Sequence, residues 1–148
     1  MNNKKIEQKR IQTFDKSYAA NIFFKKPDNY TELENFSKLS EKIISTGANY
    51  SYSPIGFSEK SLSFDLKKFN RIIDFDSKKK EITVEAGVTI NDFLNYLLKK
   101  NLWIPQIPGY PFITLGGAVA ANIHGKSCGV DGTIRNSIKS IVIFHKKN

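Results

Sequence analysis

The sequence predicts an α+β domain, and three observations carry that prediction. Runs rich in β-branched and aromatic residues alternate with two segments of helical periodicity, in the order strand, helix, strand, then strands around a second helix. The chain has 148 residues, a length that suits one domain. Its 40% hydrophobic content is enough to bury a core. We therefore expect one folded unit over residues 17–148, behind a basic leader over residues 1–16.

The strand predictions depend on short apolar runs that end at glycine, proline or polar residues. Strands are expected at residues 19–26, 42–46, 61–66, 71–76, 81–87 and 137–144. Pro27 stops the first of them. Residues 77–80, with the sequence SKKK, predict a hairpin between the fourth and the fifth.

Each helix prediction depends on a capping residue followed by apolar residues at helical spacing. Asn29 can cap a helix within residues 28–40, with Glu32 placed three residues later to bond back to the cap. Thr89 caps a second helix over residues 90–100. Asn101 follows this helix, and asparagine tolerates the left-handed conformation that ends helices.

Charge and composition exclude several classes of function. The formal net charge is +9, but the lysines are spread along the whole chain and interspersed with acids, which argues against a nucleic-acid site. The single cysteine, Cys128, excludes an internal disulfide and a cysteine-based zinc site, and suits a reducing compartment. The two histidines, His124 and His145, lack the spacing of metal ligands, so no metal site is expected.

The sequence gives no sign of a membrane span or of an export signal. No apolar run approaches the roughly 20 residues that a transmembrane helix needs. The basic start lacks the apolar core of a signal peptide. We expect a cytoplasmic protein, with peripheral association at a membrane as the alternative.

Residues 45–54, with the sequence STGANYSYSP, follow a predicted buried strand with glycine and small polar residues. Backbone N–H groups in such a turn, together with serine hydroxyls, form an array of donors suited to a phosphate or a diphosphate. The alternative is an ordinary polar surface loop.

Residues 109–129 read GYPFITLGGAVAANIHGKSCG and are much richer in glycine and alanine than the rest of the chain. Thr114 can cap a helix whose first turn holds Gly116 and Gly117. Glycines there let a ligand approach the positive end of the helix dipole without meeting a Cβ. A helix packed closely against a sheet needs the same small residues, and this alternative stays open.

The common nucleotide and hydrolase motifs do not explain these two segments. The sequence holds no GxGxxG after a strand, no GxxxxGK[ST] and no GxSxG. These absences exclude the Rossmann fingerprint, the P-loop and the nucleophile elbow as sources of the small residues.

Four ordered blocks of sequence resemble a known family. They cover residues 45–54, 63–76, 82–109 and 113–141. Together they resemble the FAD-binding domain of the vanillyl-alcohol oxidase and p-cresol methylhydroxylase type, most of all the sugar oxidases of the decaprenylphosphoryl-ribose 2′-oxidase and aldonolactone oxidase group. The resemblance runs from about Ala20 to Phe144. It implies the PCMH-type fold of two small α/β subdomains, the second one truncated, with FAD as the cofactor.

The resemblance also implies a set of cofactor-binding residues. The loop of residues 47–53, expected between the first two strand-containing halves of the flavin domain, would face the diphosphate, and Gly109 would lie against the flavin. Residues 114–117, at the start of the glycine-rich helix, would wrap the diphosphate and the ribityl chain. Residues 124–128 would run beside the isoalloxazine ring. The implied residues are Gly47, Ala48, Asn49, Tyr50, Ser51, Tyr52, Ser53, Gly109, Thr114, Leu115, Gly116, Gly117, His124, Gly125, Lys126, Ser127 and Cys128. Asn49 stands where the family often has glycine, so the loop needs asparagine at positive φ.

The implied activity is oxidation of a hydroxyl group on a sugar, a polyol or an aldonolactone, with a lipid-linked sugar among the candidate substrates. A hydride would pass to flavin N5, and His124 and Lys126 are the candidate catalytic residues. Relatives continue well beyond this length into a substrate cap, so we expect the cap in cis or in trans and no turnover by residues 1–148 alone. The alternative is a non-catalytic nucleotide-binding or basic interaction module.

The mode of flavin attachment is a further expectation from the resemblance. Many relatives bind the flavin covalently through a histidine just before the serine of the diphosphate loop, and here Tyr50 occupies that place. Cys128 is the other side chain that could carry a bond, through its thiolate. We expect FAD to be held without a covalent bond.

Overall fold

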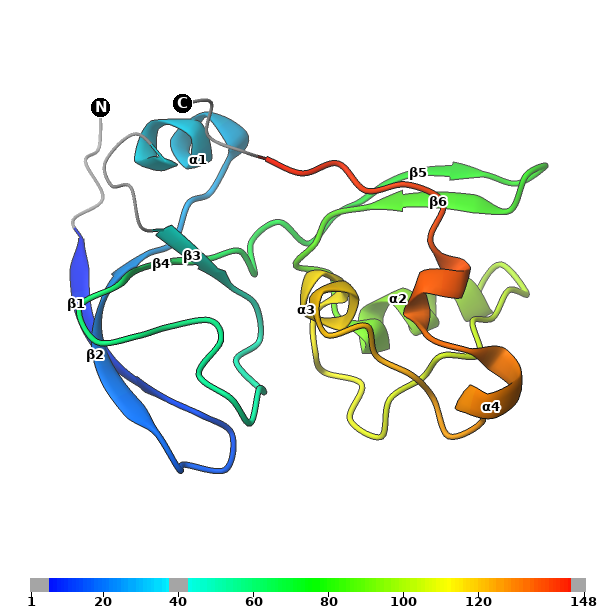
Figure 1. The fold of residues 1–148 in the computed structure, drawn as a ribbon. Coiled ribbons are helices and arrows are strands. Elements are labelled where there is room, and N and C mark those ends of the chain that lie inside the picture. Colours follow the sequence, from blue (N-terminus) through cyan, green and yellow to red (C-terminus); the bar gives the residue numbers. More distant parts are fainter. Residues whose placement is uncertain (1–5, 38–42, 145–148) are drawn as a thin grey trace. The chain divides into compact units, whose positions relative to one another are not determined.

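The computed structural model describes residues 6–37 and 43–144, and the chain forms two compact units, Met1–Phe69 and Asn70–Asn148. Each unit has its own sheet and its own buried cluster. The sequence-based prediction of an α+β fold with two small subdomains is confirmed (Figure 1).

A four-stranded sheet forms the centre of the first unit. Its strands are β1 (Glu7–Gln12), β2 (Ala19–Lys25), β3 (Ile43–Thr46) and β4 (Leu62–Asp65), in the spatial order β1-β2-β4-β3. The pairs β2 with β4 and β3 with β4 are parallel, whereas β1 runs antiparallel to β2. The carboxyl ends of β2, β3 and β4 therefore meet at one edge of this sheet.

Strand β1 corrects the expectation of a basic leader over residues 1–16. It pairs with β2 along its whole length, from Glu7 opposite Phe24 to Gln12 opposite Ala19. Only Ile11 of this strand is buried, so the charged sequence hid a strand that is held mainly by backbone hydrogen bonds at the sheet edge.

Helix α1 (Tyr30–Ser37) begins where the capping signal predicts. The side-chain Oδ1 of Asn29 accepts a hydrogen bond from the Glu32 N–H at 2.8 Å. The Glu32 carboxylate accepts from the Asp28 N–H at 2.9 Å, one residue before the expected partner. Residues 38–40, expected to continue the helix, lie outside the described residues.

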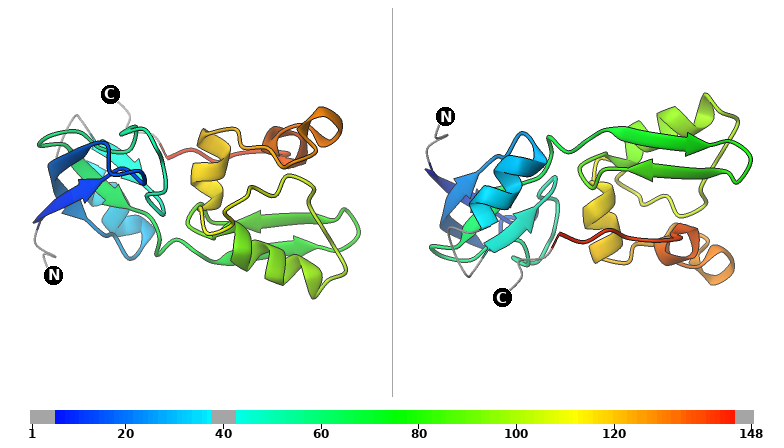
Figure 2. Two further views of the ribbon diagram at one scale, coloured as in Figure 1. Left: turned by 90° about the horizontal axis from the view of Figure 1, so that it is seen from below. Right: turned by 90° about the horizontal axis from the view of Figure 1, so that it is seen from above.

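The second unit begins with the antiparallel hairpin of β5 (Ile72–Asp76) and β6 (Glu81–Val84), as the sequence predicts. Helix α2 (Ile90–Leu98) lies along this hairpin (Figure 2), with Tyr96 and Phe75 in edge-to-face contact. Three short helical segments follow. They are α3 (Leu115–Ala120), α4 (Cys128–Asp131) and the 3₁₀ turn η1 (Ile134–Ser137).

Both ends of α2 confirm the sequence analysis. The Thr89 hydroxyl oxygen accepts a hydrogen bond from the Asp92 N–H at 3.0 Å and donates to its carboxylate at 2.7 Å. Asn101 adopts a φ of 55° just beyond the helix. The backbone therefore takes the left-handed turn that asparagine permits.

The expected strand over residues 137–144 is wrong. Residues 138–144 form no strand within the described chain, because no strand described there pairs with them. The side chains of this segment gain little from burial, since Val142 is 99% exposed and Ile141, Ile143 and Phe144 are also exposed. An apolar run in this position needs a partner edge to become a strand.

Each unit buries its own apolar cluster. In the first unit the cluster consists of Ile11, Ala20, Ile22, Phe24 and Phe57. In the second it consists of Val88, Ile90, Leu115 and Ala118, flanked by partly buried residues that include Phe93 and Ile123. The second cluster ties α3 to the start of α2, which fixes the position of the glycine-rich helix within its unit.

Candidate functional site

The loop of residues 47–53 leaves the sheet at the edge where the three parallel strands end. Thr46, the last residue of β3, pairs with Asp65, the last residue of β4. The last residue of β2, Lys25, lies one position away in the same register, opposite Phe64 of β4. Ligands of α/β sheets bind at the carboxyl ends of parallel strands, so the 47–53 loop stands where a ligand is expected.

Three successive backbone donors of the 47–53 loop are unused. Within the described residues, no hydrogen bond involves the N–H groups of Gly47, Ala48 or Asn49. All three residues are half-buried. Asn49 has a φ of 67°, which confirms the positive φ expected for it. A bent run of free N–H groups is the kind of concave surface that binds an anion.

Positive charge stands at the same edge of the sheet. The buried carboxylate of Asp65 lies 3.5 Å from the Lys67 ammonium and 4.0 Å from that of Lys26. The Lys67 N–H also donates to this carboxylate at 2.9 Å. One carboxylate facing two lysines leaves a net positive charge beside the start of the loop.

The serine residues of the loop retain hydrogen-bonding capacity. The Ser51 hydroxyl oxygen accepts from the Ser53 N–H at 3.2 Å, so its own proton stays available to a ligand. Ser51, Tyr52 and Ser53 are all exposed. This half of the loop can therefore supply a hydroxyl donor next to the free N–H groups.

The residues that contact and support the loop were not predicted from the sequence. They lie in the turn between β1 and β2, within the segment expected to be a leader. The Phe14 N–H donates to the Ser51 carbonyl at 3.0 Å, and the Phe14 ring makes edge-to-face contacts with Tyr50 and Tyr52. An aromatic residue in an otherwise polar and charged stretch was the signal available in the sequence.

The first turn of α3 differs from the loop because its N–H groups are all used. Leu115 N–H donates to the Val88 carbonyl at 2.7 Å, and Gly116 N–H donates to the Ala86 carbonyl at 2.8 Å. The third donor, Gly117 N–H, bonds to the Thr114 hydroxyl at 3.2 Å, which confirms Thr114 as the cap. The start of α3 therefore offers no free N–H group to a ligand.

The glycines of this region fall into two kinds. A Cβ at Gly116 would lie 2.9 Å from the Ala86 Cβ, so this glycine serves close packing. A Cβ at Gly117 would meet only the Thr114 hydroxyl at 3.2 Å, and one at Gly109 would meet nothing within 4 Å. The space beside Gly109 and Gly117 is open, whereas that beside Gly116 is occupied by the protein itself.

The two candidate catalytic side chains, His124 and Lys126, are exposed and flank a buried glycine. The His124 Nδ1 lies 2.9 Å from the Gly125 carbonyl oxygen. A Cβ at Gly125 would lie 2.8 Å from the Pro105 carbonyl oxygen, so the backbone here is packed tightly against the preceding loop. The exposed Cys128 begins α4, and the Ser127 hydroxyl donates to the Asp131 carboxylate.

A buried glutamine, which the sequence analysis did not single out, fixes this segment within its unit. Gln106 is 2% exposed. Its Nε2 donates to the Asp131 carbonyl at 2.7 Å, and its Oε1 accepts from the Ser137 hydroxyl at 2.6 Å. Gln106 therefore joins the loop before α3 to α4 and to η1. In the sequence, His124 and Lys126 lie between that loop and these two elements.

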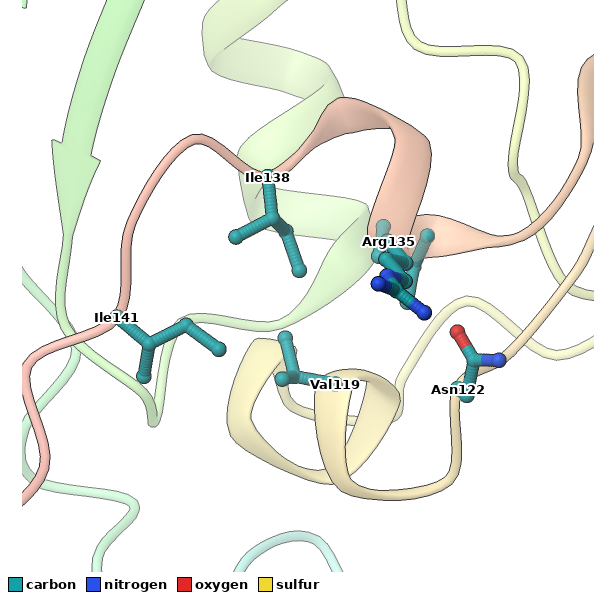
Figure 3. Close-up of a pocket in the computed structure, with 6 residues that line it drawn as sticks. Val119, Asn122, Arg135, Ile138 and Ile141 are labelled. Atoms are coloured by element: carbon teal, nitrogen blue, oxygen red, sulfur yellow. The ribbon is translucent and has the colours of Figure 1, made fainter.

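A mostly apolar groove of about 390 Å³ lies elsewhere in the second unit, between α3 and η1 (Figure 3). Its lining residues are Val119, Asn122, Ile134, Arg135, Ile138 and Ile141. No residue that the sequence analysis assigned to the cofactor lines it. The groove is therefore separate from the candidate site.

The described residues hold neither a group of metal ligands nor a helix that could span a membrane. No group of three or more histidine, cysteine, aspartate or glutamate side chains there could hold a metal ion. The helices in the same part of the chain are all too short or too polar to cross a bilayer. The 47–53 loop and residues 109–128 belong to different units, so their convergence on one ligand stays a prediction.

Comparison with known proteins supports the flavin interpretation. A family described as an FAD binding domain matches residues 26–146. Decaprenylphosphoryl-β-D-ribose oxidase of Mycolicibacterium smegmatis is 32% identical over 102 residues, which cover 69% of this chain and 22% of that protein. L-gulonolactone oxidase of Mus musculus is 25% identical over 120 residues, which cover 78% of this chain and 27% of that protein. The chain thus spans about a quarter of the length of these relatives.

Solved structures show the same fold. Cholesterol oxidase from Brevibacterium sterolicum superposes with a TM-score of 0.69 at 21% identity, over 82% of this chain and 25% of that one. Alkyldihydroxyacetonephosphate synthase gives a TM-score of 0.67 at 19% identity, over 85% of this chain and 29% of that one. The resemblance read from the four sequence blocks is confirmed, FAD is the cofactor that the match identifies, and the chain belongs to the FAD binding domain family.

Proposed function

We propose that the chain holds the diphosphate of FAD at the 47–53 loop, as the N-terminal part of an oxidoreductase that oxidises a CH–OH group of a sugar, a polyol or an aldonolactone. One observation carries this proposal. The N–H groups of three successive half-buried residues of the loop have no partner among the described residues, in a chain of the FAD binding domain family.

The residues of the first unit fit the diphosphate of the cofactor. A diphosphate presents several anionic oxygens, and the loop presents the N–H groups of residues 47–49 and the Ser51 hydroxyl. Lys26 and Lys67 supply positive charge at the same sheet edge. The hydrogen-bond donors of the loop and the two lysine charges together suit the diphosphate, which is the anionic part of FAD.

The second unit fits a different part of the cofactor. Gly109 and Gly117 leave open space where side chains would stand, which suits close approach of a large planar group. The first turn of α3 has no free N–H group, so we assign it close contact rather than hydrogen bonding to the diphosphate. This assignment narrows the role that the family resemblance implied for residues 114–117.

Bound FAD supplies a hydride acceptor at N5. His124 is suited to be the general base, because its Nδ1 can only donate to the Gly125 carbonyl, and the neutral ring then carries its lone pair on Nε2. Lys126 carries an exposed positive charge two residues away and could stabilise developing negative charge. Both roles are proposals for exposed side chains on either side of Gly125, whose backbone packs closely against the Pro105 carbonyl.

The names of the relatives support the substrate class. The oxidases act on a decaprenylphosphoryl-ribose and on L-gulonolactone. D-lactate dehydrogenase of Anaerostipes hadrus, 31% identical over 78 residues, covers 53% of this chain and 16% of that protein. The compounds in these names share a carbon that bears a hydroxyl group. We propose that a substrate cap, in cis or in trans, completes the site, and that residues 1–148 alone do not turn over.

The test is a binding comparison of FAD, ADP and riboflavin on the purified chain. ADP carries the diphosphate without the flavin, and riboflavin carries the flavin without the diphosphate. We expect ADP to compete with FAD and riboflavin to bind far more weakly. Equal binding of riboflavin and FAD would remove the loop from the site, and no binding of FAD or ADP would refute the proposed function of this chain.

The reaction is tested in a protein that contains this chain together with a substrate cap. L-gulonolactone, a polyol and D-lactate are added anaerobically while the visible absorbance of the flavin is followed. Bleaching by one of them identifies an oxidoreductase and its substrate class. A protein that binds FAD and is bleached by none of a broad panel of alcohols would support the alternative of a non-catalytic nucleotide-binding module.

A further inference from the structure

We propose that Phe14, in the turn between β1 and β2, is a positioning residue that holds the 47–53 loop in the shape that binds a diphosphate. The inference rests on the proposed function and deepens it, because it assigns a role to a residue that lies before the family match, which begins at residue 26. Phe14 contacts the loop and contributes none of the proposed donors to the ligand.

Two kinds of contact join Phe14 to the loop. Its backbone N–H donates to the Ser51 carbonyl at 3.0 Å, which ties the middle of the loop to the β1–β2 turn. Its ring lies 5.6 Å from the Tyr50 ring at 80° and 5.5 Å from the Tyr52 ring at 75°, between ring centroids. Both are edge-to-face arrangements, the favourable geometry for aromatic pairs.

The β1–β2 turn is rigid enough to act as a support. Thr13 is buried, and its N–H donates to the Tyr18 carbonyl at 2.9 Å across the turn. The Asp15 carboxylate accepts from the Thr13 hydroxyl at 2.7 Å and from the Ser17 hydroxyl at 2.8 Å. The turn therefore keeps its shape through its own bonds and does not depend on the loop.

The loop needs support because its donors are unused within the described chain. The bend at residues 47–49 has no backbone hydrogen bond of its own there. Asn49 adds a left-handed conformation that non-glycine residues adopt at a cost. The contacts that Phe14 makes with Tyr50, Ser51 and Tyr52, one to three residues after Asn49, are then the means of holding the bend in shape.

The Phe14 side chain is 45% exposed, so burial in the core does not explain why a phenylalanine stands at this position. Phe23, on strand β2 of the same hairpin, is 37% exposed and offers a matched comparison. The two phenylalanines differ in that the ring of Phe14 packs on the loop. Removing either ring should cost a similar and small amount of folding stability.

The experiment compares Phe14→Ala, Phe14→Tyr and Phe23→Ala in the full chain. We measure the affinity for ADP and FAD, the thermal midpoint, and the backbone amide resonances of residues 47–49. Phe14→Ala is expected to weaken ADP binding about fivefold, since aromatic pairs contribute on this order. Phe14→Tyr restores affinity to within about twofold, and Phe23→Ala leaves it unchanged, with similar midpoints for both alanine variants.

Unchanged ADP affinity in Phe14→Ala would overturn the inference, and so would an equal loss in Phe23→Ala. Failure of the wild-type chain to bind ADP or FAD would refute the proposed function and would be seen before any variant is compared. In that case the amide resonances still test whether Phe14 holds the shape of the 47–53 loop. Resonances of residues 47–49 that do not move in Phe14→Ala show that Phe14 does not position the loop.

Discussion

The 47–53 loop and the first turn of α3 each contain two adjacent small residues, Gly47 with Ala48 and Gly116 with Gly117, yet they use their backbone donors in opposite ways. In the loop, the N–H groups of residues 47–49 have no partner among the described residues. At the start of α3, residues 115–117 donate to two carbonyls and to the capping Thr114 hydroxyl. The free N–H groups of the loop suit the proposed ligand, whereas at Gly116 the missing side chain makes room for neighbouring protein.

The difference shows that a glycine-rich segment does not identify a binding site until its N–H groups have been traced. Gly116 is explained by Ala86, which stands against it. Gly117 has open space beyond the Thr114 hydroxyl and remains available for close contact with a cofactor. Neighbouring glycines of one motif therefore have different reasons to be glycine, and substitutions can separate them.

The largest expected effect is all-or-none. It concerns whether the flavin is bound covalently, either at Tyr50 in the 47–53 loop or at Cys128 in the second unit. When FAD-loaded protein is denatured in acid and centrifuged, we expect all of the yellow colour in the supernatant. Tyr50 of the loop packs its ring on Phe14, and Cys128 lies exposed at the start of α4. Colour that stays in the pellet, and is lost in Cys128→Ala but retained in Tyr50→Phe, would place a covalent bond in the second region.

The next effect concerns stability of the second unit. In Gly116→Ala the new Cβ would stand 2.9 Å from the Ala86 Cβ and 3.1 Å from its carbonyl oxygen. Overpacking against backbone costs about 2 kcal/mol. The midpoint of unfolding, followed through Trp103, the chain's single tryptophan, should fall accordingly. Gly117→Ala is the matched control and should cost less than about 1 kcal/mol, because alanine favours the helix. An equal loss of stability in Gly116→Ala and Gly117→Ala would contradict the distinction between a closely packed and an open glycine.

A smaller effect is expected at Asn49 of the loop. Valine disfavours positive φ strongly, whereas glycine adopts it freely, so Asn49→Val should distort the loop and Asn49→Gly should preserve it. We expect the valine variant to bind ADP about tenfold more weakly, equivalent to about 1.4 kcal/mol. Calorimetric titration measures both variants. Equal affinity of the two would mean that the left-handed bend does not present the donors.

The sequence predicted the local features well because they depend on neighbouring residues. The caps at Asn29, Thr89 and Thr114, and the positive φ of Asn49 and Asn101, each follow from the chemistry of one side chain and an adjacent backbone group. The positions of most strands followed from their apolar runs. These predictions required no knowledge of distant partners.

What the sequence did not predict depends on residues that are far apart in the chain. Strand β1 exists because β2 offers it hydrogen bonds, despite its charged side chains. Residues 137–144 have strand-like composition but pair with no described strand. The support of the loop by Phe14 joins residues that the sequence separates by more than 30 positions. Composition alone carries no record of such partners.

The smallest expected effect tests whether acid loosens the support of the loop through Asp15. The Thr13 hydroxyl, followed by the N–H and hydroxyl of Ser17, holds the pKa of Asp15 below its ordinary value. An unfolded aspartate titrates near 3.9, so the stability that this carboxylate contributes is present above that pH. It is lost as the pH falls through the lower pKa of the folded state, when the protonated carboxyl releases its donors.

The measurement follows the amide resonances of Phe14 and residues 47–49 as the pH is lowered below about 4. We expect them to shift together in the wild type and not in Asp15→Asn. Asp76 is the control, because the Lys79 N–H lowers its pKa in the second unit in the same way, so Asp76→Asn should leave the loop titration unchanged. If the loop amides of Asp15→Asn titrate as in the wild type, a group other than Asp15 causes the titration. Protonation of Asp15 would then not reach the loop through the turn that carries Phe14.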